Sequence, residues 1–94
     1  KPSPPSPMRL LAATRQPYDT LVKDYPKAAW AYNQLAWLSA TCKRDLEKGL
    51  ASAKRAVELA PNSAAYHDTM AEVLFQMGKK DYAVAAQKKA AIAP

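Results

Sequence analysis

The sequence predicts an all-α protein arranged as an α-solenoid, a stack of antiparallel helix pairs, and three observations lead to this prediction. Only two of the 94 residues are glycine, and the hydrophobic residues, 49% of the chain, are rich in alanine, which favours helices. No run alternates apolar and polar residues as a half-buried strand does. The third observation is an internal repeat of 33 to 35 residues, a period that is typical of solenoids.

The repeat is marked by a junction at which one helix ends, a proline follows and a new helix begins. In RAVELAPNSAAYHDTMA, residues 55–71, Pro61 cannot continue a helix interior, and the Asn-Ser pair after it favours an N-cap. The segment TLVKDYPKAAWAYNQLA, residues 20–36, aligns with it without gaps at an offset of 35, so that Pro26 falls on Pro61. KKAAIAP, residues 88–94, repeats the junction a third time.

Each period is predicted to contain two helices joined by a turn. We expect the first pair to run from about 28 to 41 and from 46 to Pro61, with Asp45 as the N-cap of its second helix. In the second pair, Gly78 occupies the place of a left-handed C-cap. Small residues allow the paired helices to approach closely, and these are Ala36, Gly49, Ala53, Ala56, Ala71, Ala83 and Ala90.

The period divides the chain into four segments. They are a Pro/Ser-rich linker at 1–7, a capping helix and leading half-repeat at 8–26, and two repeats at 27–61 and 62–94. Within the second segment we expect a short helix at 8–14 and a separate helix at 17–25, with Pro17 in its first turn. The opening linker suggests that the chain is cut from a longer protein.

At these residues the sequence resembles the tetratricopeptide repeat. The family's signature is an apolar/small pair in the first helix, a small residue opening the second, another small residue seven later, and then a proline. The matching residues are Leu35, Ala36, Gly49, Ala56 and Pro61 in one repeat, and Met70, Ala71, Gly78, Ala83, Ala90 and Pro94 in the next. The resemblance covers residues 20–94 and implies a right-handed solenoid. The usual aromatic residue of the second helix is replaced by Ala53 and by the polar Gln87.

The family resemblance also implies a role as a protein-interaction module. Similar arrays hold a partner's peptide or helix in a concave groove that is lined mainly by first helices. Carried onto this chain, the groove residues are Trp30, Asn33, Trp37, Asp68, Glu72, Phe75 and Gln76. The alternative is that the tryptophans pack internally, which we favour for Trp30 and leave open for Trp37. Of the clamp with which one subclass grips a terminal carboxylate, only Asn33 is present, so we do not expect that activity.

The basic residues indicate a second candidate binding surface, an alternative to the groove. The net charge is +6, and two basic pairs fall in the turns inside the helix pairs, namely Lys43, Arg44, Lys79 and Lys80. Stacking would line them up as a basic edge able to meet an acidic partner or nucleic acid. Because no aromatic residues are interleaved with them for base stacking, we do not expect nucleic acid to be the partner.

Little in the sequence supports an enzyme. The only histidine, His67, and the only cysteine, Cys42, fall near opposite ends of the predicted stack, too far apart for a Cys–His dyad. We therefore expect a packed or capping His67 and a half-buried Cys42, with no catalytic, metal or cofactor residues. No apolar run approaches the ~20 residues of a membrane span, so we expect a soluble protein with no membrane partner, and favour the cytoplasm.

These observations predict a scaffold or adaptor that buries a partner segment against Trp37, with Asp68 and Glu72 supplying charge complementarity. Two alternatives remain. Two and a half repeats fall below the three that solenoids usually need, so the chain could be a spacer that assembles with a second copy through its open ends. The other alternative is binding through the basic edge.

Overall fold

The structure, a computed structural model, describes the backbone of residues 7–92 and the side chains of residues 16–91. Every regular element in this range is a helix. The five helices are α1 (Pro7–Asp24), α2 (Ala29–Cys42), α3 (Leu46–Leu59), α4 (Ala64–Gln76) and α5 (Lys80–Ile92). The prediction of an all-α protein is thus confirmed for the described residues, and the linker expected at 1–7 lies outside them except for Pro7, which opens α1.

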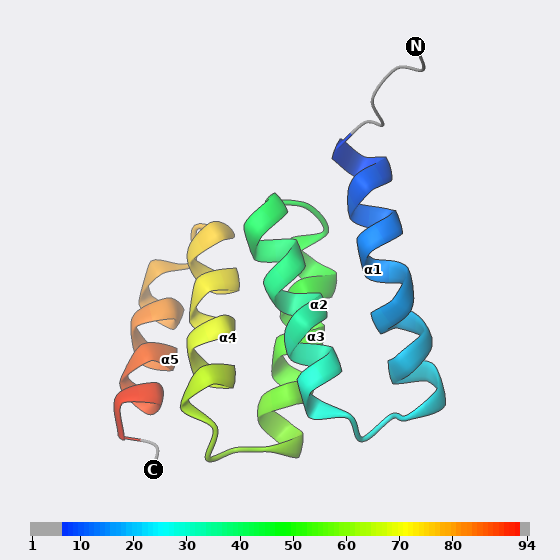
Figure 1. The fold of residues 1–94 in the computed structure, drawn as a ribbon. Coiled ribbons are helices and arrows are strands. Elements are labelled where there is room, and N and C mark those ends of the chain that lie inside the picture. Colours follow the sequence, from blue (N-terminus) through cyan, green and yellow to red (C-terminus); the bar gives the residue numbers. More distant parts are fainter. Residues whose placement is uncertain (1–6, 93–94) are drawn as a thin grey trace.

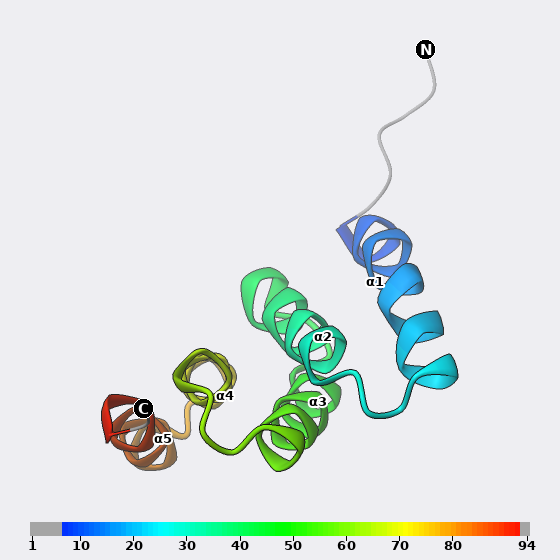
Figure 2. The same cartoon turned by 60° about the horizontal axis from the view of Figure 1, so that its bottom comes forward.

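Each helix packs against the next along the chain, and α2 also contacts α4 (Figure 1). The closest associations are those of α2 with α3 and of α4 with α5. Figure 2 shows α4 beside both α2 and α3, with α5 beyond it at the edge of the molecule. The result is an elongated body of 51 × 31 × 18 Å with α1 at one end and α5 at the other (Figure 1).

The prediction of two separate helices at 8–14 and 17–25 is wrong, because α1 is one helix that contains Pro17. A proline inside a helix loses one backbone hydrogen bond, but its fixed φ of about −65° matches helical geometry. The residues on both sides, LLAAT and YDTLVKD, include good helix formers. The loss of one bond therefore does not separate the two halves.

The helix ends agree with the predicted turns, with one difference. Gly78 has a φ of 81°, as expected for a left-handed C-cap. Ser63 is the N-cap of α4, and its Oγ accepts a hydrogen bond from the Tyr66 backbone N–H at 3.4 Å. Asp45 does precede α3, but its φ is 50° and its side chain makes no capping bond to the helix.

Small residues form most of the core, as the sequence predicted. Ala36, Ala40, Ala53 and Val73 make one buried cluster between α2, α3 and α4. A second cluster joins α4 to α5 through Ala71, Leu74, Ala83 and Ala86. The α2 and α3 helices approach each other closely at Gly49, where an added Cβ would lie 2.6 Å from the Cβ of the buried Ser39. The helices are held at a distance that only glycine permits here.

Candidate functional site

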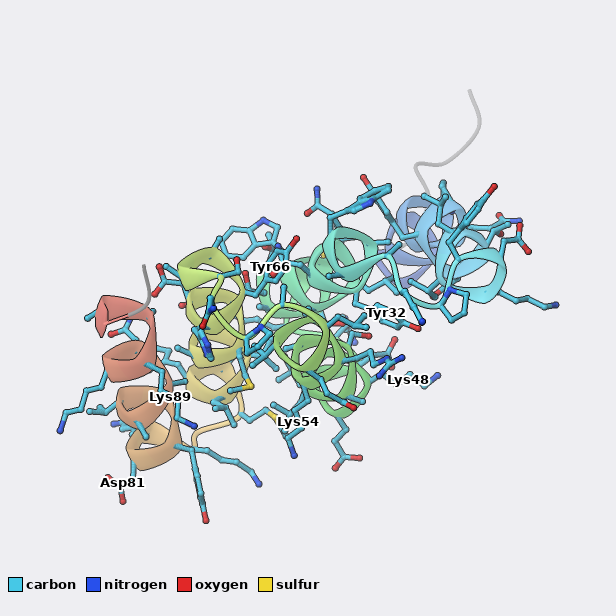
Figure 3. The ribbon with its side chains drawn as sticks, turned by 90° about the horizontal axis from the view of Figure 1, so that it is seen from below. Tyr32, Lys48, Lys54, Tyr66, Asp81 and Lys89 are labelled. Atoms are coloured by element: carbon cyan, nitrogen blue, oxygen red, sulfur yellow. The ribbon has the colours of Figure 1, made fainter. Side chains whose placement is uncertain are left out.

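The seven predicted groove residues all lie on α2 and α4. Trp30, Asn33 and Trp37 belong to α2, and the others, Asp68, Glu72, Phe75 and Gln76, to α4. The two helices contact each other, and Figure 3 shows them along one side of the molecule, with α3 and α5 along the other. We call the surface that these seven residues were predicted to form the α2–α4 face.

Three aromatic side chains of this set are largely exposed. Trp30 is 52% exposed, Trp37 48% and Phe75 55%. A side chain of this size is usually covered in a monomeric protein, and exposed aromatic groups are favoured anchors at interfaces. The packing that we favoured for Trp30 is therefore incomplete, and for Trp37 half of the indole is open to a partner.

The polar members of the set differ in accessibility. The Asp68 side chain is exposed, whereas Glu72 and Gln76 are half-buried. The Gln76 Nε2 donates a hydrogen bond of 2.9 Å to the Glu72 Oε1, which fixes this carboxylate along the helix. The Asn33 Oδ1 is buried and has no hydrogen-bond partner among the described residues, so this oxygen is not available at the surface. Asp68 and Glu72 thus carry the negative charge of the α2–α4 face.

Tyr66 is a residue of this surface that the sequence analysis missed. Its side chain lies on the same side as α2 and α4, at the start of α4 (Figure 3), and is half-buried. Under the 35-residue offset it corresponds to Ala31, which is fully buried. Because the equivalent residue is small and buried, the repeat alignment did not assign Tyr66 to the surface. The exchange of alanine for tyrosine between equivalent positions is the signal that could have found it.

Trp30 also borders a shallow hollow at the turn between α1 and α2. The hollow has a volume of about 580 Å³, and its apolar wall includes Leu21, Tyr25 and Pro26. Tyr25 is itself 64% exposed. The indole of Trp30 thus forms part of an apolar surface that continues from α2 onto the preceding turn.

His67 and Cys42 do not approach each other. His67 lies in the first turn of α4, and Cys42 ends α2 at the opposite end of the helices (Figure 1). His67 is buried, as expected, and its Nε2 donates to the Pro61 carbonyl oxygen at 2.7 Å, because a carbonyl can only accept. Cys42 is exposed, not half-buried as expected, because the helix end leaves its side chain uncovered.

The four residues of the basic edge lie at one end of the helices. Lys43 and Arg44 are in the turn after α2, and Lys79 and Lys80 are at the start of α5, at the same end as the first pair (Figure 1). All four side chains are exposed. Lys54 of α3 and Lys89 of α5 lie on the side opposite Tyr66 (Figure 3). Lys54 and Lys89 are therefore separated from the carboxylates of the α2–α4 face, whereas Lys80 lines a hollow together with Glu72.

The described residues hold neither a candidate metal cluster nor a helix suited to cross a membrane. In residues 16–91, no three His, Cys, Asp or Glu side chains gather in a way that could hold a metal ion. None of the described helices combines the length and apolar character needed to cross a bilayer.

Comparison of the chain with protein-family models, with curated proteins and with solved structures gives no match.

Proposed function

We propose that the chain is a tetratricopeptide-like α-solenoid that acts as a protein-interaction module. The 33- to 35-residue period and the small residues at equivalent positions support the repeat architecture. The association of α2 with α3 and of α4 with α5 is what a stack of helix pairs requires. The module would serve as a scaffold or adaptor.

The α2–α4 face binds a peptide or helix of the partner in this proposal. The observation that carries it is the exposure of Trp30, Trp37 and Phe75 on two helices that contact each other. Aromatic anchors supply large contact areas, and their burial excludes water from the centre of an interface. Asp68 and Glu72 add negative charge, so the preferred segment is basic or amphipathic, and its cations would meet these carboxylates.

The test is binding of a diverse peptide library to the wild type and to Trp37→Ala, each at low and at moderate salt. We expect the substitution to lower the affinity for the peptides by about tenfold or more, because an interface anchor contributes about 2 kcal/mol or more to the binding free energy. The helical circular dichroism signal should be nearly unchanged, because Trp37 is 48% exposed. Loss of helicity would instead identify Trp37 as a core residue.

Tyr82→Ala is the matched control. Tyr82 is an aromatic residue of α5 that is 67% exposed, and it lines a hollow with Leu50 and Lys54 rather than the α2–α4 face. Truncation of Tyr82 should leave the affinity for the peptides unchanged. Equal weakening by both variants would point to nonspecific apolar adsorption and would contradict the proposal.

The basic edge supports a second candidate function, since its four exposed cations lie at the same end of the helices. Binding there would ignore Trp37→Ala, fall steeply with salt, and be lost when Lys43, Arg44, Lys79 and Lys80 are reversed in charge. Absence of any peptide binding would favour a structural spacer. Concentration-dependent dimers in light scattering would support assembly through the open ends of the solenoid.

A further inference from the structure

The α4–α5 pair has a hollow on its surface that is lined mainly by apolar side chains. Its volume is about 420 Å³, and its walls are formed by Ala71, Phe75, Ala83, Val84 and Gln87. Glu72 and Lys80 also line it. We call this surface the end face. Phe75 and Val84 are 55% and 54% exposed, so the end face presents apolar groups that no described helix covers.

The same surface exists on the α2–α3 pair, where a helix covers it. The 35-residue offset of the first helices relates Ala71 and Phe75 to Ala36 and Ala40. The second helices have an offset of 34 residues, and it relates Ala83, Val84 and Gln87 to Gly49, Leu50 and Ala53. On α2 and α3, the surface around Ala36, Ala40 and Ala53 is covered by α4, whose Met70, Val73 and Met77 pack there.

We propose that the end face docks an amphipathic helix of a partner, in the orientation that α4 has on α2 and α3. The required helix presents aliphatic side chains at positions i, i+3 and i+7, the spacing of Met70, Val73 and Met77. Trp30 and Trp37 do not line this hollow, whereas Phe75 and Glu72 belong both to it and to the α2–α4 face. The chain would thus have two adjoining surfaces for partners, which share these two residues.

Two features of the end face specify this occupant. The first is continuity with an interface inside the chain, because α4 is at once the helix docked on α2–α3 and half of the end face. The second is charge. A helix parallel to α4 would have its C-terminus at the end of the molecule where Lys80 begins α5 (Figure 1). The partial negative charge of a helix C-terminus is stabilised by a cation there.

Gln87 is the main polar difference between the two surfaces, because the equivalent Ala53 is fully buried under α4. Phe75, in the place of the buried Ala40, is the main apolar difference. The Gln87 amide must move aside, or find a polar partner, when an aliphatic helix docks. A helix with the α4 sequence should therefore bind the end face, and bind it more tightly when Gln87 is replaced by alanine.

The experiment uses a synthetic peptide with the sequence of residues 64–77, held helical by a lactam bridge on its solvent-facing side. It is titrated into the isotopically labelled full chain and followed by amide shifts in NMR spectra. We expect shifts in α4 and α5 around Phe75 and Val84. Val84→Glu should weaken binding by about tenfold or more, because docking would bury its charge, and Gln87→Ala should strengthen it.

Tyr82→Glu is the matched control, since it places the same charge on an exposed apolar position of α5 away from the end face. It should change the affinity less than about twofold. Trp37→Ala should also leave this peptide's affinity unchanged. A negative result for the end face can therefore be distinguished from a negative result for binding on the α2–α4 face. Absence of binding, or equal weakening by both glutamate variants, would overturn the proposal. Dimers of the chain that Val84→Glu abolishes would also overturn it, by making a second copy the occupant.

Discussion

The α2–α3 pair and the α4–α5 pair have the same pattern of residues but different neighbours. We call them the inner pair and the outer pair. In the inner pair, Ala40 and Ala53 are buried because α4 covers them. In the outer pair, the equivalent Phe75 and Gln87 are exposed. Position in a repeat thus fixes which surface a residue joins, while the neighbouring helix decides whether that surface becomes core.

The largest predicted effect separates the two pairs at one equivalent position. Ala53→Gln should lower the free energy of unfolding by about 3 kcal/mol, since it overfills a buried site and buries an amide. The reverse substitution, Gln87→Ala, should change stability by less than about 0.5 kcal/mol, because Gln87 is exposed. Urea unfolding followed by circular dichroism measures both. Similar effects at the two positions would mean that α3 is no better covered than α5.

The close approach at Gly49 provides the second prediction. Gly49→Ala should destabilise the protein by about 1–2 kcal/mol, because the free-energy cost of overpacking against Ser39 exceeds the gain from the better helix propensity of alanine. At the equivalent position Ala83→Gly should also destabilise, by about 1 kcal/mol, through lost propensity. Thermal unfolding of both variants is the measurement. A more stable Gly49→Ala variant would show that α2 and α3 are more widely spaced than described.

The N-caps of the first helices differ as well. Ser63 caps α4 with its side chain, while the equivalent Ala28 has no side-chain cap for α2. Ser63→Ala should cost about 1 kcal/mol of stability. Ala28→Ser should raise stability by up to about 1 kcal/mol, since it offers α2 the missing acceptor. Both changes are read from urea unfolding midpoints, and a neutral Ser63→Ala would show that the cap contributes nothing.

The smallest predicted effect concerns the turns. Gly78 and Lys43 are equivalent under the 35-residue offset and have φ angles of 81° and 54°. Lys43→Gly should stabilise the chain by about 0.5–1 kcal/mol, because glycine adopts this left-handed conformation without the strain of a Cβ. Gly78→Ala should destabilise by a similar amount, although its surroundings are open. Differential scanning calorimetry can detect changes of this size, and a destabilising Lys43→Gly would contradict the assigned turn.

The sequence alone predicted the helices, their approximate ends and the small residues of the core. These follow from local propensity, from proline and from spacing. It could not decide whether Pro17 divides a helix, because that depends on the helix-forming strength of both flanks. Nor could it settle the exposure of Trp37, because helical spacing assigns a side chain to a face without showing what covers that face.

Native-state hydrogen exchange tests the difference between the inner and the outer pair most directly. The α3 helix packs against both α2 and α4, whereas α5 packs among the described helices against α4 alone. We expect the central amides of α3 to exchange about tenfold or more slowly than those of α5, because helices with fewer buried contacts open at lower free energy. Equal protection of α3 and α5 at high dilution would contradict the comparison, since it would show that the outer pair opens no more easily than the inner pair.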